Sequence, residues 1–185
     1  MAEYYLISQL PSLDGLSEGA PLPITEDRFL ELCGRFLGKK AQSELEKLTL
    51  VPPILPEKSK SKLIAAWNTA ERELRLALAK ARANKMNKTF DLEGRLLSVE
   101  LIKIATAAIE TENPLDAEKF LLNHRLQLLE RLRPADHFSE DYLYYYGLKL
   151  KLLLRIRQLD TQLGKTEYRK LYDSILRGDR LEATK

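Results

Sequence analysis

Few side chains in this sequence have the types and spacing that catalysis or metal binding requires. The Gly-Lys-Thr string at 164–166 matches the end of a phosphate-binding loop, but Leu159 stands where that loop needs its first glycine. The end of one helix and the start of the next explain this string better. His124 and His137 have no cysteine or acidic partner at ligand spacing, whereas zinc sites use three or four ligands. The sequence therefore predicts a non-catalytic protein with no metal site and no cofactor.

Cys33 is the only cysteine, and it lies beside Phe29 and Phe36 on the apolar stripe of a predicted helix. This position predicts a buried, inert thiol, because a cysteine nucleophile needs an electropositive and partly exposed setting. A single cysteine excludes an internal disulfide and is typical of a reducing compartment, so we expect a cytoplasmic protein.

Four tyrosines between positions 142 and 146 precede four basic residues between positions 149 and 157. Base stacking and phosphate contacts by such residues would bind single-stranded nucleic acid. Helical spacing separates the two groups, however, so tyrosines that pack a helix end and snorkelling basic side chains are the favoured interpretation. With 30 Lys+Arg against 27 Asp+Glu, the net charge of +3 is also too balanced for a nucleic-acid binder, and no nucleic-acid partner is predicted.

The apolar residues repeat every three to four positions along most of the chain, which predicts an all-α protein. At 185 residues, of which 44% are hydrophobic and 31% charged, the chain fits a single helical domain spanning 1–185. We expect a helical bundle of about six helices. No apolar stretch approaches the roughly 18–20 residues that a membrane span needs, so no direct span is predicted.

The predicted domain divides into segments of different character. Three prolines at 52, 53 and 56 exclude a helix there and mark the clearest boundary. The last long helix carries two interleaved apolar sets, so we expect contacts on two of its sides and a break at Gly164. The predicted segments are an N-terminal docking segment with short helices in 1–50, a Pro-rich loop near 51–56, a helical body over 61–177 with long helices near 61–84 and 139–163, and a frayed tail at 178–185.

The long helix near 61–84 carries a heptad seam whose small residues would let a partner helix approach closely. Glu71 and Arg75 are expected to form an ion pair on its exposed side. Arg72, Arg75 and Arg82 are our predicted partner-binding residues, because with Lys80 they could form a stripe that meets an acidic surface. The alternative is an ordinary solvated face.

The most informative segment is the opening run, whose aromatic and apolar residues must dock on the fold. Its sequence is Tyr4-Tyr5-Leu6-Ile7-Ser8-Gln9-Leu10-Pro11. This run resembles the start of an uncharacterised bacterial family encoded in the operons of V-type (A/V-type) rotary ATPases. Two further stretches are similar to that family: a middle helix with Trp67, Glu71, Arg72, Arg75 and Arg82, and a Leu-rich C-terminal pair at 144–163 and 168–176.

The resemblance implies a divergent form of the C subunit of V-type ATPases, which is the equivalent of the eukaryotic d subunit. Such a protein links the central shaft to the membrane rotor ring, so the implied partners are central-stalk subunits and the rotor ring. The implied location is cytoplasmic, peripheral to the inner membrane through the ATPase complex. The C subunit proper has three similar helical units, and 185 residues could supply one of them. A free-standing helical adaptor is the second interpretation; a nucleic-acid-binding helical domain and an enzyme rank below it.

Overall fold

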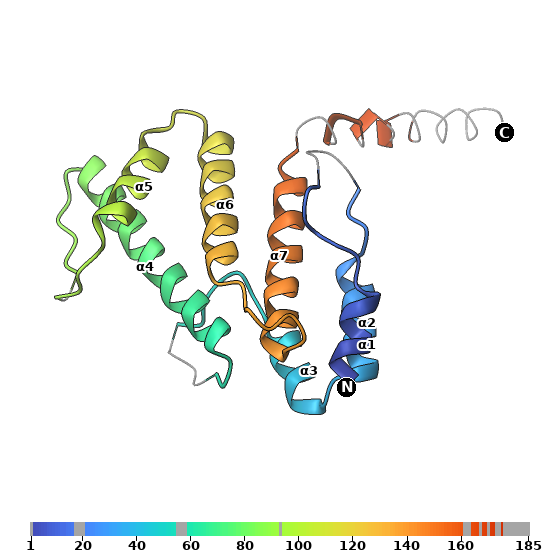
Figure 1. The fold of residues 1–185 in the computed structure, drawn as a ribbon. Helices are drawn as coiled ribbons and strands as arrows, with labels where there is room; N and C mark the ends of the chain where they lie inside the picture. Colours follow the sequence, from blue (N-terminus) through green and yellow to red (C-terminus); the bar gives the residue numbers. More distant parts are fainter. Residues whose placement is uncertain are drawn as a thin grey trace, which may run out of the picture.

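The computed structural model describes residues 2–16, 21–54, 59–92 and 94–160, and, within 164–175, all but 167, 170, 173 and 174. These residues form helices and irregular segments without a strand, so the predicted all-α fold is confirmed (Figure 1). The helices in chain order are α1 (Ala2–Gln9), α2 (Glu26–Phe36), α3 (Lys39–Glu46), α4 (Lys62–Lys85), α5 (Val99–Glu110), α6 (Pro114–Arg131) and α7 (Glu140–Gln158), followed by a helical stretch within 164–175.

Side-chain caps set where most of these helices begin. The hydroxyls of Thr25 and Ser139 accept the backbone N–H groups of Arg28 and Tyr142, both at 3.2 Å, and so satisfy donors that the first turn leaves open. The same capping bond is made by Ser61, Ser98 and Asn113. These two caps fix where α2 and α7 begin.

Helix α7 is the centre of the molecule. It lies between α6 on one side and α2 on the other, and it also contacts α3 and α4 (Figure 1). Every residue from Leu143 to Leu150 is buried, which confirms the predicted contacts on two of its sides. Gly147 permits the closest approach, because a Cβ built there would lie 3.2 Å from the Phe29 ring and 3.1 Å from Leu48.

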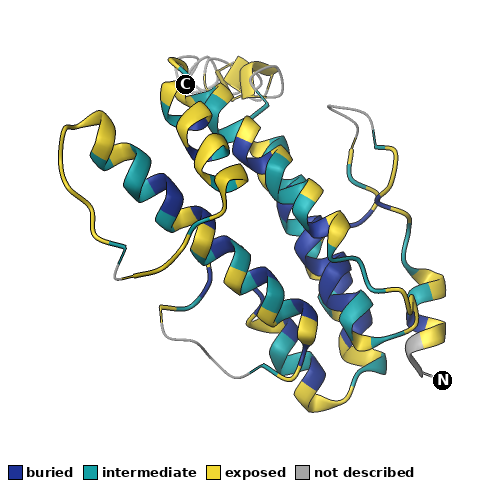
Figure 2. Cartoon of the chain, turned by 60° about the vertical axis from the view of Figure 1, so that its left-hand side comes forward, coloured by how far each residue is buried: buried dark blue, intermediate teal, exposed yellow. Residues whose placement is uncertain are grey.

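Helices α4, α5 and α6 enclose a second, smaller core. The heptad seam of α4 is divided between the two cores: Trp67 belongs to the larger one around α7, whereas Leu74 and Ala77 belong to the smaller one. Alanines of α5, Ala105 and Ala108, complete the smaller core, and α4 and α5 lie in extensive contact. Figure 2 shows buried residues running along the lengths of α4 and α7.

The opening run, for which no secondary structure was predicted, forms α1, and Pro11 lies just beyond the end of that helix. The structure differs from the sequence-based expectation in two places. Helix α7 ends at Gln158 rather than near 163, because the N–H groups of Leu159 and Asp160 bond to carbonyls three residues back and tighten the last turn. Gly164 is helical, and its N–H donates to the Asp160 carbonyl, so the predicted break there is wrong.

Two predictions fall partly or wholly outside the described residues. Within the Pro-rich loop, residues 51–54 are not helical, as expected, and 55–56 lie outside the described part. The predicted frayed tail at 178–185 also lies outside it. Among the described helices, none combines the length and the apolar character needed to cross a bilayer.

Candidate functional site

The three predicted partner-binding arginines all lie on α4, but in different environments. Arg72 is half-buried: its Nη2 donates to the Pro53 carbonyl at 3.2 Å, and its Nε is buried with no hydrogen-bond partner among the described residues. Arg75 is exposed and pairs with Glu71 at 3.0 Å, and Arg82 is exposed in the last turn. Arg75 and Arg82 are therefore accessible to a partner, whereas Arg72 is held by its own chain.

Glu71 occupies a different place from the one expected. The sequence predicted an exposed ion pair with Arg75, but Glu71 is completely buried. Arg125 of α6 binds it through two parallel hydrogen bonds of 2.9 Å, from Nε and from Nη2. A buried carboxylate is tolerated only when its charge is paired, and this two-pronged geometry is the strongest form of such a pair. The contact clamps α4 to α6 across 54 residues of sequence, a separation that local spacing does not reveal.

A second buried charge, Lys149, lies at the middle of α7. Its Nζ contacts Glu130 at the end of α6 at 2.6 Å, Asp14 of the N-terminal loop, and the Tyr145 hydroxyl at 3.3 Å. That hydroxyl in turn donates to Glu130 at 2.7 Å. Arg133 lies over the Tyr145 ring and pairs with Asp14 at 3.5 Å, so one lysine gathers groups from three segments.

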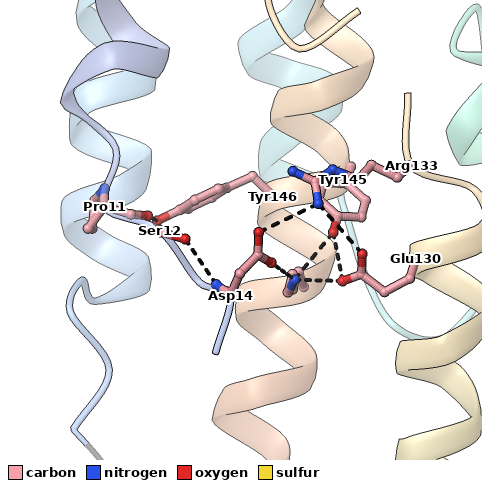
Figure 3. Close-up of polar contacts among 8 residues, drawn as sticks. Pro11, Ser12, Asp14, Glu130, Arg133, Tyr145 and Tyr146 are labelled. Atoms are coloured by element: carbon pink, nitrogen blue, oxygen red, sulfur yellow. Dashed lines mark hydrogen bonds and ion pairs between the residues drawn. The ribbon is translucent and has the colours of Figure 1, made fainter. Parts of the chain in front are cut away.

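The opening run is fixed to α7 next to this cluster. The Tyr146 hydroxyl donates to the Pro11 carbonyl at 2.8 Å (Figure 3). Leu6 and Leu13 are buried in the larger core. The expected docking is thus confirmed for Leu6 and for the end of the run at Pro11, and Leu13 fixes the segment that follows.

The electrostatics of the Lys149 cluster hold its charges in place. Burial opposes the charged form of Lys149, but the hydrogen bonds from its Nζ to Asp14 and Glu130 outweigh that effect and raise its pKa. The hydrogen bond from Lys149 lowers the pKa of Asp14. Burial, with the bond to Glu130, raises the pKa of Tyr145 to about 12. All three groups keep one protonation state across the neutral range, as suits a structural contact.

The remaining candidates for chemistry have ordinary surroundings. Cys33 is buried, as predicted, and burial raises the pKa of its thiol to about 12. Burial lowers the pKa of His124, and His137 is exposed with its ring 5.0 Å from that of Tyr142. Within the described part of the chain, no three histidine, cysteine or acidic side chains gather closely enough to hold a metal ion.

An exposed aromatic patch, formed by Tyr4, Tyr5 and Phe138, lies where α1 meets the loop before α7. The rings of Tyr4 and Phe138 are 4.9 Å apart, and those of Tyr4 and Tyr5 are 6.0 Å apart and nearly perpendicular. Tyr4 is 55% exposed, Tyr5 is 60% exposed and Phe138 is 50% exposed. Sequence reasoning expected both tyrosines to be docked and did not single out Phe138, because nothing in the sequence places these distant segments side by side.

The fold and these contacts define an all-helical protein with an exposed aromatic patch. Its helices are held together by the buried charges Glu71 and Lys149 and their partners, a part of the molecule that we call the braced centre. Comparisons with protein-family models, curated proteins and solved structures gave no match to this chain.

Proposed function

We propose that this chain is a non-catalytic coupling or assembly subunit of a bacterial V-type rotary ATPase, with a role like that of the C subunit between the central shaft and the membrane rotor ring. One observation carries the proposal. The opening run, on which the resemblance depends, is anchored by Leu6, and by Leu13 just beyond its end, while Tyr4 and Tyr5 face solvent. A segment built in this way can bind a partner without leaving its own fold.

The aromatic patch has the composition of a protein-binding surface. Tyrosine and other aromatic residues are enriched in interfaces between proteins, and they carry much of the binding energy there. Three such rings, each at least half exposed, lie together on one surface of this molecule. We expect this patch to contact a stalk subunit, with Arg75 and Arg82 as further predicted contacts on α4.

The braced centre is consistent with a mechanical role. A subunit that passes torque must transmit force without deforming, and its helices must therefore be tied to one another. Glu71 with Arg125 ties α4 to α6, and Lys149 with Glu130 and Asp14 ties α7 to α6 and to the N-terminal loop. In this proposal the chain acts on the cytoplasmic side, peripheral to the inner membrane through the ATPase complex.

A free-standing helical adaptor is the second candidate. The aromatic patch favours it as well, because an exposed patch needs a protein partner but does not require that the partner belong to an ATPase. The two candidates differ in one respect, which is whether the shaft and catalytic subunits bind the chain.

Co-expression of the tagged chain with the shaft and catalytic subunits of its own V-type ATPase separates these candidates. We expect a stoichiometric complex in affinity purification and gel filtration, and its loss in a Tyr4→Ser, Tyr5→Ser variant. A control variant, Val51→Ser with Ile54→Ser, removes two other exposed apolar side chains and should assemble normally. A chain that stays monomeric while the other subunits assemble would reject the ATPase role.

A further inference from the structure

The helical stretch within 164–175 carries four large side chains on one face. Tyr168, Leu171, Tyr172 and Ile175 follow the spacing i, i+3, i+4, i+7, which places them on a single stripe of a helix. They are 69%, 62%, 52% and 58% exposed, in that order, and the two tyrosine rings stack with centroids 6.3 Å apart. We call these four residues the C-terminal stripe.

The C-terminal stripe lies away from both cores. The stretch follows α7 and extends outward beyond the end of that helix, on the side away from α4 and α5 (Figure 1). None of its four residues belongs to either hydrophobic core. A contiguous row of exposed apolar side chains of this kind marks a surface that another molecule covers.

Its spacing identifies the form of that contact. Anchors at i, i+3, i+4 and i+7 are the pattern by which an amphipathic helix lies in an apolar groove of a larger protein. A coiled coil requires apolar heptads sustained over at least about three repeats, and the stripe provides one. The two tyrosines suit such a groove, because each combines an apolar ring with a hydroxyl and tyrosine is enriched in interfaces between proteins.

The charges beside the stripe indicate the chemistry of the groove. Lys165 and Arg169 are exposed, lie one turn apart, and follow the same edge of the stripe. An antiparallel pair of such helices from two copies would bring these basic edges together, which is unfavourable. A groove with carboxylates along one side would instead be complementary to this edge.

We propose that the C-terminal stripe is a docking helix that inserts into an apolar, acid-edged groove of a protein partner, with Lys165 and Arg169 meeting the carboxylates. This inference rests on the proposed function for the identity of the partner, which is then a component of the central shaft. The aromatic patch and the C-terminal stripe are separate contacts with that shaft.

The test uses the intact chain and purified central-shaft subunits of the same ATPase, titrated by calorimetry at low and at physiological salt. Leu171→Ser with Ile175→Ser should weaken binding about tenfold or more, because two buried aliphatic anchors are lost. The matched control, Leu96→Ser with Val99→Ser, removes two exposed aliphatic side chains on and before α5 and should bind like the unaltered chain. Lys165→Glu with Arg169→Glu should weaken binding most at low salt. All variants should keep the same circular-dichroism melt.

Each outcome decides the proposal. Undiminished binding by Leu171→Ser with Ile175→Ser would overturn the docking helix and leave the ATPase role intact. Failure of the unaltered chain to bind the shaft would reject both. Two further arms examine other occupants: sedimentation of the chain alone, and flotation with vesicles of phosphatidylcholine and phosphatidylglycerol. Self-association that is abolished by Leu171→Ser with Ile175→Ser would assign the stripe to a second copy of the chain. Vesicle binding abolished by the same variant would assign it to a membrane, and either result would overturn the proposal.

Discussion

Helix α7 and the helical stretch at 164–175 are built from the same residue types, yet one lies at the centre of the molecule and the other on its surface. Both combine tyrosines and leucines at helical spacing with lysines and arginines. In α7 the segment from Leu143 to Leu150 is covered on all sides, whereas the C-terminal stripe is more than half exposed. The difference comes from the neighbours: α2, α3, α4 and α6 pack around α7, while the stripe lies in neither core. The same pattern therefore stabilises the fold in one place and offers a binding surface in the other.

The largest expected effect comes from truncating one leucine in each region. Leu148→Ala in α7 should lower the free energy of unfolding by about 2–5 kcal/mol, because Leu148 is completely buried and its removal leaves a cavity. Leu171→Ala in the stripe should change it by less than about 0.5 kcal/mol. Urea denaturation followed by circular dichroism measures both. Equal effects from the two substitutions would mean that the stripe is packed in the free protein.

The buried charges of the centre give the next effect. Arg125→Met leaves Glu71 buried with only the exposed Arg75 as partner, so it should destabilise the fold by about 3 kcal/mol. Adding Glu71→Gln to that variant should restore part of the loss, because the uncompensated charge is then removed. A single Arg125→Met variant as stable as the unaltered chain would show that this clamp does not brace α4 against α6.

Alanine substitutions at two glycines, one in each region, test the same comparison, because each adds a single methyl group. Gly147→Ala should destabilise the protein by about 1–3 kcal/mol, since the new Cβ would crowd Phe29 and Leu48 in the core. The new Cβ of Gly164→Ala would meet no atom within 4 Å. This substitution should instead stabilise the helical stretch by up to about 1 kcal/mol, the difference in helix propensity, and so raise the helix content. Thermal melts and the helical circular-dichroism signal distinguish these opposite signs, and a stabilising Gly147→Ala would contradict the close packing around α7.

The smallest effect is the pH dependence of the contact between Asp14 and Lys149. That hydrogen bond lowers the pKa of Asp14 in the folded state, so its contribution to stability is present above the ordinary value of 3.8 and is lost as the pH falls through the folded value. Asp14 is exposed, so the contribution should be below about 1 kcal/mol. Asp14→Asn should therefore be less stable than the unaltered chain at neutral pH, and the gap should close as the pH falls below 3.8. A gap of constant size across this range would contradict the assignment.

The sequence predicted the helices well because their signals are local. The apolar repeats and the two apolar sets of α7 depend on residues within a few turns of one another. The contacts of the candidate site were not predictable in this way. Arg125 reaches Glu71 across 54 residues and Tyr146 reaches Pro11 across 135, and both contacts exist only once the helices have packed. Exposure of Tyr4 and of the C-terminal stripe was missed for the same reason, since periodicity shows that a face is apolar but not what covers it.

The comparison between α7 and the C-terminal stripe is tested most directly by hydrogen exchange on the chain alone and with the central-shaft subunits of its ATPase. We expect the amides at 143–150 of α7 to be protected in both samples, because that part of the helix is buried among α2, α3, α4 and α6. Those at 164–175 should exchange quickly in the free chain and slowly in the complex, as the stripe becomes covered. A stable complex in which the amides at 164–175 exchange as they do in the free chain would contradict the proposed docking helix, and the absence of any complex would contradict the coupling role itself.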